Sequence, residues 1–326
     1  MKRISRRIFL TSAAGAAFAP ALPHPASALD YPTRPVRWIN GFAPGGAPDV
    51  IARLLGQWLG ARLGQNFVVE NRPGAGTNIA TETVARAAAD GYTLLLIASP
   101  NLINASLYAH LSFDFVRDIA PVGTIGRNPF VMVTSAAFPA KTVAEFIAYA
   151  KADPGKINMT STGTGNLTNF AGELFKMMAG VDMVSVPASS EMQAQSDLLT
   201  GRVQVMFDPI VSSMGYIKSG QFRALGVTSA ERLPSLPEVP VIGEAVPGYA
   251  VDGWLGLGAP SGTPDAIIET LNAALAAGIA DPQIKERLIN LGFVPTAMTP
   301  GRFGTFIADE TAKWAKVVKF AGVKLD

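Results

Sequence analysis

Cysteine is absent from this chain of 326 residues, and histidine occurs only twice. The first absence excludes disulfides, thiolate metal sites and cysteine nucleophiles, so ordinary apolar cores must hold the fold together. The shortage of histidine removes the usual residue of zinc sites and catalytic triads. His110 stands alone in a loop-like segment. We therefore expect no metal, no cofactor and no catalytic residue.

The N-terminus has the parts of a removable export signal. Four basic residues, ending at Arg6 and Arg7, precede an apolar, alanine-rich run, and small residues follow at 26–28. We expect cleavage after Ala28, and residues 5–10 resemble a twin-arginine signal. The alternative is a retained membrane anchor, but the apolar run is too short to span a bilayer. The sequence therefore predicts an exported protein whose signal, residues 1–28, is removed.

The apparent basicity of the chain belongs to this signal. Residues 1–28 hold four of the 27 Lys and Arg and none of the 25 Asp and Glu, so the mature chain has 23 against 25 and a formal charge of −2. A nearly neutral chain without a Lys/Arg run has no electrostatic footprint for nucleic acid. No later apolar segment is long enough to cross a membrane. We expect an exported protein that is a monomer and does not bind nucleic acid.

Strand-like runs alternate with helical patterns along the mature chain, which predicts an α/β fold with parallel sheets. The expected strands after the first are 67–70, 93–97, 130–134, 157–160, 183–186, 203–207 and 223–227. The expected helices, from apolar residues at helical spacing, are 50–63, 143–152, 167–179, 192–200, 267–279 and 300–320.

A short apolar strand, 36–40, runs into a glycine turn and then a helix, which is the layout of an anion-binding site. Glycine lets the backbone approach a ligand, Pro48 suits a first helical position, and free N–H groups carry the positive end of the helix dipole. The alternative is a simple strand-to-helix turn. The candidate ligand-binding residues here are Phe42, Ala43, Pro44, Gly45, Gly46 and Asp49.

A second strand, turn and helix repeat this arrangement later in the chain. Hydroxyl and backbone N–H groups converge at the start of the second helix, although such a turn is often only a helix cap. Two such turns on facing lobes can hold one anion between them. The candidate residues of the second turn are Ser161, Thr162, Gly163, Thr164, Gly165 and Thr168.

The whole mature chain resembles the substrate-binding proteins of tripartite tricarboxylate transporters, the Bug-type periplasmic receptors. The similarity is carried by a series of short segments in the family's order rather than by any one of them. They are 31–36, the turn 44–46 with Asp49, 69–76 (Val-Glu-Asn-Arg-Pro-Gly-Ala-Gly), 90–94, 171–175, 197–201, 223–229 and 259–264.

The resemblance implies a two-lobed periplasmic binding protein fold of type II, with the ligand cleft between the lobes. One lobe is expected to contain residues 29–125 and 229–326, and the other residues 126–228. Without the resemblance, the sequence also allows two sequential domains, because no change in composition marks the point where the chain would cross back into the first lobe.

The resemblance also implies that backbone N–H groups, small hydroxyls and ordered water hold a carboxylate ligand. It places Asp208 at the cleft edge, where helix capping before Pro209 is the alternative role. Asp49 favours a helix N-terminus but would repel an anion unless it faces an ammonium group or an ordering water. The chain departs from the family at Asn40-Gly41, where Val-Pro is common, and at Ala188-Ser189-Ser190, where Tyr-Lys-Gly is common. Ala188 and Ser189 are therefore candidates for altered ligand specificity.

These observations predict a solute receptor, not an enzyme, which binds a small organic acid and delivers it to membrane permease subunits. One alternative is a sensor or scaffold that presents its closed form to a membrane signalling partner. A less favoured alternative is an exported hydrolase, for which the chain lacks a Gly-x-Ser-x-Gly elbow.

Overall fold

The computed structural model describes residues 30–161 and 166–325. The chain divides into a unit of residues Met1–Tyr31 and a unit of residues Pro32–Asp326. All but two residues of the first unit lie outside the described ranges, and so do the expected signal and its cleavage point. The fold below is that of the second unit.

Three parallel strands open the described fold, and the first of them lies in the middle. β1 (Val36–Asn40) pairs with β2 (Phe67–Asn71) on one side and with β3 (Thr93–Ala98) on the other. A helix follows each strand closely: α1 (Ala47–Leu63), α2 (Asn78–Ala85) and α3 (Ser99–Leu107). α1 begins one residue before Pro48, which therefore stands at the second helical position and not the first.

A second group of three parallel strands repeats this topology. β5 (Ile157–Ser161) lies between β6 (Met183–Pro187) and β7 (Val205–Pro209), and the helix α5 (Val143–Ala152) precedes it. The helices that follow the strands are α6 (Leu167–Ala179), α7 (Glu191–Leu199) and α8 (Ile210–Lys218). In each group the chain therefore enters at the central strand, and its next two strands flank it.

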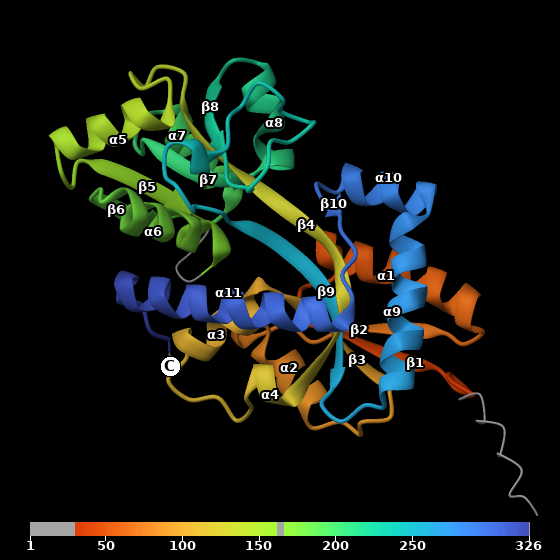
Figure 1. Ribbon diagram of the computed structural model, residues 1–326. Helices are drawn as coiled ribbons and strands as arrows, with labels where there is room; N and C mark the ends of the chain where they lie inside the picture. The colour runs from red at the N-terminus through yellow and green to blue at the C-terminus, as the bar shows by residue number, and fades with distance from the viewer. Residues whose placement is uncertain (1–29, 162–165, 326) are drawn as a thin grey trace, which may run out of the picture. The chain divides into compact units, whose positions relative to one another are not determined.

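Two long strands connect the groups, and they make the sheet mixed. β4 (Ile119–Ser135) pairs antiparallel with β9 (Asp252–Pro260) over its first part and with β7 and β8 (Phe222–Val227) over its second. β9 also pairs antiparallel with β3, and the short β10 (Val294–Pro295) pairs antiparallel with β4 (Figure 1). The prediction of parallel sheets is therefore right for each group of three strands and wrong for β4, β8, β9 and β10.

The remaining helices complete the cover of the sheet. α11 (Pro300–Ala321) packs against α3, β4 and α6, and α9 (Asp265–Ala280) packs against α1 and β4 (Figure 1). Thr299 caps α11 through the N–H of Arg302, and Gly322 ends that helix with a positive φ. The other helical segments are α4 (Phe115–Asp118), α10 (Pro282–Asn290) and the 3₁₀ turns Ala75–Thr77 and Ile242–Glu244.

Aromatic side chains form much of the core. Phe175 packs edge-on against Phe146 and Tyr249, and the buried Tyr249 hydroxyl donates to the carbonyl of Ala171 at 3.0 Å. The ring of Trp314 on α11 lies 6.2 Å from that of Phe170 on α6. These contacts fix α6 from two directions, which matters because α6 carries the second of the two turns.

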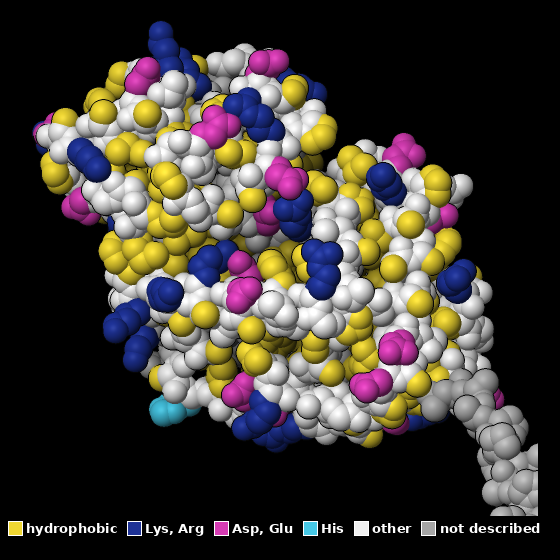
Figure 2. Space-filling model, viewed as in Figure 1, with side chains coloured by type: hydrophobic (Ala, Val, Ile, Leu, Met, Phe, Trp, Pro, Cys, Tyr) yellow, Lys and Arg dark blue, Asp and Glu magenta, His cyan; other side chains and the backbone are white. Residues whose placement is uncertain are grey.

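The surface carries charges of both signs. Figure 2 shows basic and acidic side chains interspersed over the face in view, as expected for a nearly neutral mature chain. Within residues 30–161 and 166–325, no helix combines the length and the apolar character that a membrane crossing requires.

Candidate functional site

The candidate site starts from the carboxyl ends of the two central strands. In open α/β sheets, ligands bind outside these ends, where neighbouring connections leave in opposite directions. β1 ends at Asn40 and is followed by the exposed turn residues 43–46, and β5 ends at the buried Ser161. Both of the turns predicted from the sequence therefore follow the central strand of a group of three.

The carboxylate of Asp49 holds the first turn together. One oxygen accepts the backbone N–H of Gly45 at 2.9 Å and the Nε of Arg53 at 3.1 Å. The other accepts the amide of Asn71, the last residue of β2, at 2.7 Å. The Asp49 side chain is 5% exposed, and Arg53 also pairs with it across one helical turn at 3.0 Å. Asp49 thus links the turn, α1 and β2.

The charge of Asp49 is neutralised inside the protein. Burial on its own would raise the pKa of this carboxyl, but hydrogen bonds from Arg53, Gly45 and Asn71 outweigh it and hold the pKa at about 2. The carboxylate is therefore ionised at neutral pH, and Arg53 balances it. This answers the electrostatic difficulty raised by the sequence, because Asp49 needs no ammonium group on a ligand to offset its charge.

Two backbone donors that the sequence assigned to the ligand serve the turn itself. The N–H of Phe42 donates to Oδ1 of Asn40 at 3.1 Å, and the N–H of Gly45 donates to Asp49. No side chain caps the N-terminus of α1, whose N-cap residue is Gly46. Pro48 has no N–H, so the donors at the start of the helix are those of Gly46, Ala47 and Asp49. The donors that this turn leaves available for an anion therefore lie four to seven residues after Phe42.

A strained segment, residues 74–77, packs against Gly41 at the start of the first turn. Residues 74–77 all have positive φ, including Ala75 at 45° and Thr77 at 82°. Asn104 donates to the carbonyl of Gly76 at 2.6 Å and so helps to fix this conformation. A Cβ at Gly41 would lie 2.7 Å from the Cβ of Thr77. The glycine at the Asn40-Gly41 departure is thus required by the close approach of this segment.

The second turn lies partly outside the described residues, because Thr162, Gly163, Thr164 and Gly165 fall in the undescribed range. On its far side Asn166 caps α6 by accepting the N–H of Asn169 at 2.9 Å. The hydroxyl of Thr168 donates to the same Asn166 oxygen at 2.8 Å. The cap predicted as one role for this turn is therefore present.

Ala188 and Ser189 follow β6, the neighbour of β5. The N–H of Ala188 donates to the carbonyl of Ser161 at 2.8 Å, which places these residues beside the end of the central strand. Ser189 is exposed, and Ser190 caps α7 through the N–H of Gln193. Small side chains thus lie beside the end of the central strand.

Asp208 lies on β7, on the other side of β5, and is 2% exposed. One of its oxygens, Oδ2, accepts the hydroxyl of Ser213 at 2.6 Å and the amide of Gln195 at 3.2 Å. The alternative role of a helix cap is wrong, because the N-cap of α8 is Pro209 and no side chain caps that helix. Burial, with a smaller contribution from the charge of Glu191, raises the pKa of Asp208 to about 7 in spite of the hydrogen bonds from Ser213 and Gln195.

Asp208 lines a small cavity of about 50 Å³ together with residues that follow or flank the ends of β5 and β7. The other lining residues are Ser161, Thr168, Glu191, Ala194, Met206, Phe207 and Pro209. Three residues predicted from the sequence, Ser161, Thr168 and Asp208, therefore meet around one cavity.

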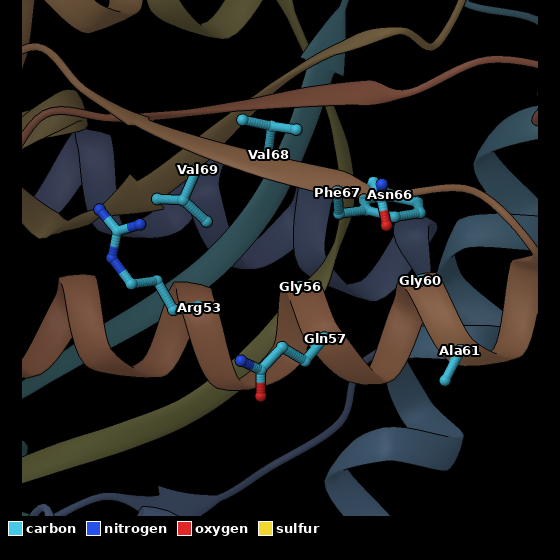
Figure 3. A pocket seen from close by; sticks show the side chains of 9 residues that line it. All are labelled: Arg53, Gly56, Gln57, Gly60, Ala61, Asn66, Phe67, Val68 and Val69. Atoms are coloured by element: carbon cyan, nitrogen blue, oxygen red, sulfur yellow. The ribbon is translucent and has the colours of Figure 1, made fainter.

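A larger cavity, of about 480 Å³, lies between α1 and β2 at the edge of the sheet. Figure 3 shows the side chains of Arg53, on the helix, and Val69, on the strand, extending into the space between the two elements. A Cβ at Gly56 would lie 3.2 Å from the carbonyl of Phe67, so glycine allows the close approach of helix and strand. Only Arg53, the partner of Asp49, connects this cavity with the first turn. The cavity lies along the side of α1 and not at its N-terminus.

Several residues of the site were not predicted from the sequence. Arg53 stands four residues after Asp49 on a predicted helix, so this ion pair was available from spacing alone. Gln195 lies on α7, which precedes β7, and Ser213 lies on α8, which follows it. No spacing pattern in the sequence predicts that both side chains contact Asp208. In the described part of the chain, no group of three His, Asp or Glu side chains could hold a metal ion.

The fold and the turns at its strand ends define a solute-binding protein of the periplasmic type. The chain belongs to the tripartite tricarboxylate transporter family of receptors, whose sequence model matches residues 51–323. This confirms the α/β periplasmic binding protein fold and the resemblance to the Bug-type receptors. The family is one of receptors and not of enzymes.

Individual relatives agree with this assignment. The chain is 36% identical to protein BugT of Bordetella pertussis over 304 residues, which cover 92% of this chain and 93% of BugT. It is similar to the structure of Rpa4515 of R. palustris with adipate, at 35% identity and a TM-score of 0.74, covering 90% of this chain and 99% of that one. It is also similar to MatC of Rhodopseudomonas palustris with bound malate, at 31% identity and a TM-score of 0.71, covering 88% and 100%.

Proposed function

We propose that this protein is a periplasmic receptor that binds a small organic acid between two lobes and delivers it to the permease subunits of a tripartite tricarboxylate transporter. The observation that carries the proposal is the first turn, where α1 presents an uncapped N-terminus beside an internally neutralised Asp49. Such a terminus binds anions through backbone N–H groups and the helix dipole. The adipate and malate in the structures of two relatives support a carboxylate as the anion.

The lobes are proposed as residues 29–125 with 229–326, and residues 126–228. The pairing of β4 supports this division, because Ile119–Pro129 pair with β9 whereas Phe130–Ser135 pair with β7 and β8. The ligand is proposed to contact residues 42–49 of the first lobe and residues 161–168, Ala188, Ser189 and Asp208 of the second. Cleavage of the signal after Ala28, interaction with a permease and a monomeric state are parts of the same proposal.

A screen for stabilising ligands tests this function. An organic acid at about 100 times its dissociation constant should stabilise the folded protein by about 2.7 kcal/mol and raise its melting temperature by several degrees. The mature chain is heated with each member of a panel of mono-, di- and tricarboxylates, amino acids and aromatic acids. A panel that leaves the transition unchanged throughout would contradict the proposal.

A backbone substitution tests the role of the α1 N-terminus. Ala47→Pro removes one N–H at the first helical position, where proline is tolerated and where the preceding Gly46 has an extended ψ of 164°. A charge-assisted hydrogen bond contributes about 1.5–3 kcal/mol, so the affinity for the acid found in the screen should fall about tenfold or more. Calorimetric titration measures this.

Ala47→Ser is the matched control, since it changes the side chain and keeps the N–H. The serine variant is expected to bind like the parent protein. If the proline variant folds normally and also binds like the parent, the α1 N-terminus is not a donor to the ligand.

A further inference from the structure

The cavity beside Asp208 has a polar group that the fold leaves without a partner. Both hydrogen bonds to this carboxylate, from Ser213 and Gln195, go to Oδ2. Among the described residues no donor lies within hydrogen-bond distance of Oδ1. Protein atoms also do not cover Oδ1 completely, so it remains accessible. Asp208 itself is 2% exposed and lines the cavity. Oδ1 is therefore the atom through which Asp208 meets the contents of the cavity.

The two donors also determine which oxygen can carry a proton. The amide of Gln195 has hydrogens to give, and its other neighbour is the carbonyl of Ser212 at 3.5 Å, so nitrogen and not oxygen faces Asp208. Because the Gln195 nitrogen can only donate to Oδ2, the proton of a neutral Asp208 is favoured on Oδ1. The O–H group then points into a space of about 50 Å³, which is enough for a water molecule or for one carboxylate group of a ligand.

We propose that Asp208 binds the ligand as a neutral carboxylic acid, donating a hydrogen bond from Oδ1 to one carboxylate of the organic acid. This inference rests on the proposed function and adds to it a proton that is taken up with the ligand. An O–H donor to a carboxylate oxygen forms a short, strong hydrogen bond, whereas an ionised Asp208 would place two anions in contact.

The charged surroundings of Asp208 favour the neutral form. Glu191 at the start of α7 is the titratable group that lines the same cavity, and its charge opposes ionisation of Asp208. On the neighbouring helices Asp197 pairs with Arg202 beside α7 and Glu173 pairs with Lys176 on α6, and Lys218 stands at the far end of α8. β4 contributes the apolar Val131 opposite Asp208, and α8 contributes the neutral Ser213. Burial and Glu191 together place the pKa of Asp208 at about 7.

Two titrations test the proposal. In the unliganded mature protein labelled with ¹³C at aspartate carboxyl carbons, one signal should titrate near pH 7 and be missing in Asp208→Asn. Adipate, malate and the acid with the largest effect in the thermal screen are then titrated calorimetrically at pH 6.0 and pH 8.5. Because only the protonated fraction binds, the dissociation constant should be roughly 30-fold higher at pH 8.5.

Variants separate Asp208 from other causes of pH dependence. Asp208→Asn keeps a hydrogen-bond donor but cannot titrate, so it should bind with equal affinity at both pH values. Asp153→Asn, at an exposed position, should keep the dependence of the parent. Ser213→Ala removes a hydrogen bond that lowers the pKa of Asp208, so the midpoint of the dependence should move to higher pH.

The outcomes distinguish this inference from the proposed function. If none of the probes binds at either pH, the receptor function fails. If a probe binds equally well or better at pH 8.5, if the dependence persists in Asp208→Asn, or if the Asp208 signal titrates below pH 5, the neutral-acid role is wrong and the receptor function stands.

Discussion

Asp49→Ala is expected to weaken ligand binding by about ten- to a hundredfold, because one carboxylate holds the turn, α1 and β2 in register. Its removal leaves the Gly45 N–H, the Asn71 amide and the Arg53 guanidinium without their acceptor, so water must hydrogen-bond to them instead. Since Gly45 is exposed and the Arg53 side chain is 49% exposed, water can replace part of the loss. We therefore expect the free energy of unfolding to fall by only about 1–3 kcal/mol.

The pH dependence of this variant has a definite sign. The pKa of Asp49 is lowered to about 2 in the folded protein, so its contribution to stability is complete above the unfolded value of 3.8 and is lost as the pH falls through 2. The difference in unfolding free energy between parent and variant should be constant from about pH 5 to pH 8 and should shrink between about pH 4 and pH 2.

Urea unfolding and calorimetric titration measure the two effects. Asp153→Ala is the control, because Asp153 forms an ion pair with Lys156 while 58% exposed, and exposed pairs contribute about 0–1 kcal/mol. If Asp49→Ala binds as tightly as this control, the first turn does not depend on Asp49 for its binding geometry.

Trp314→Ala should give the largest loss of stability, about 3–5 kcal/mol. The side chain is completely buried, packs against Phe170 of α6, and donates its indole N–H to Glu310 at 2.9 Å. Truncation leaves a cavity where α11 meets α6 and removes a hydrogen-bond donor to Glu310, whose side chain is only 13% exposed. Urea unfolding followed by circular dichroism measures the loss.

Phe320→Ala on the same helix is the matched control. Phe320 is 51% exposed, so its truncation removes a large aromatic side chain without opening a cavity in the core. A loss below about 1 kcal/mol is expected there. Equal losses for the two variants would mean that the end of α11 contributes as much to stability as its buried middle.

Hydrophobic periodicity predicted several elements to the residue. The helices 143–152 and 167–179 and the strand starts at 67, 93, 157 and 183 agree with the structure. The two helices have an apolar face that repeats at the helical period and are followed by Asp153 and Gly180, whereas β3 is an apolar run that is buried at every position. Local sequence is enough in such segments because burial of one face determines the element.

The sequence did not predict β9 or the first half of β4, because the glycines in these strands are required by packing and not by turns. A Cβ at Gly256 of β9 would lie 2.5 Å from the ring of Phe303, and one at Gly258 would lie 2.5 Å from Ile97. In sequence these glycines resemble strand breakers. Within β4 only residues 130–134 were predicted as a strand, because Pro121, Gly123 and Gly126 interrupt the first half of its sequence.

The candidate site shows the same division. The two turns could be recognised because glycines, hydroxyls and Pro48 stand next to one another in the sequence. The partners of Asp208 could not, because Gln195 and Ser213 come from different helices and meet only after β7 is in place. The role of Phe42 as an internal donor depended on Asn40, whose side chain turns back on the chain two residues later.

The antiparallel pairing of β3 with β9 has a consequence for the order of folding. Leu95 pairs with Gly258, so the first group of strands keeps an open hydrogen-bonding edge until most of the chain has been synthesised. Contacts of such large sequence separation form late, and an unpaired strand edge invites association with other chains in the meantime. Completing β9 before the protein leaves the cytoplasm would close that edge, and the twin-arginine signal predicted from the sequence would allow this order, because such signals export folded chains.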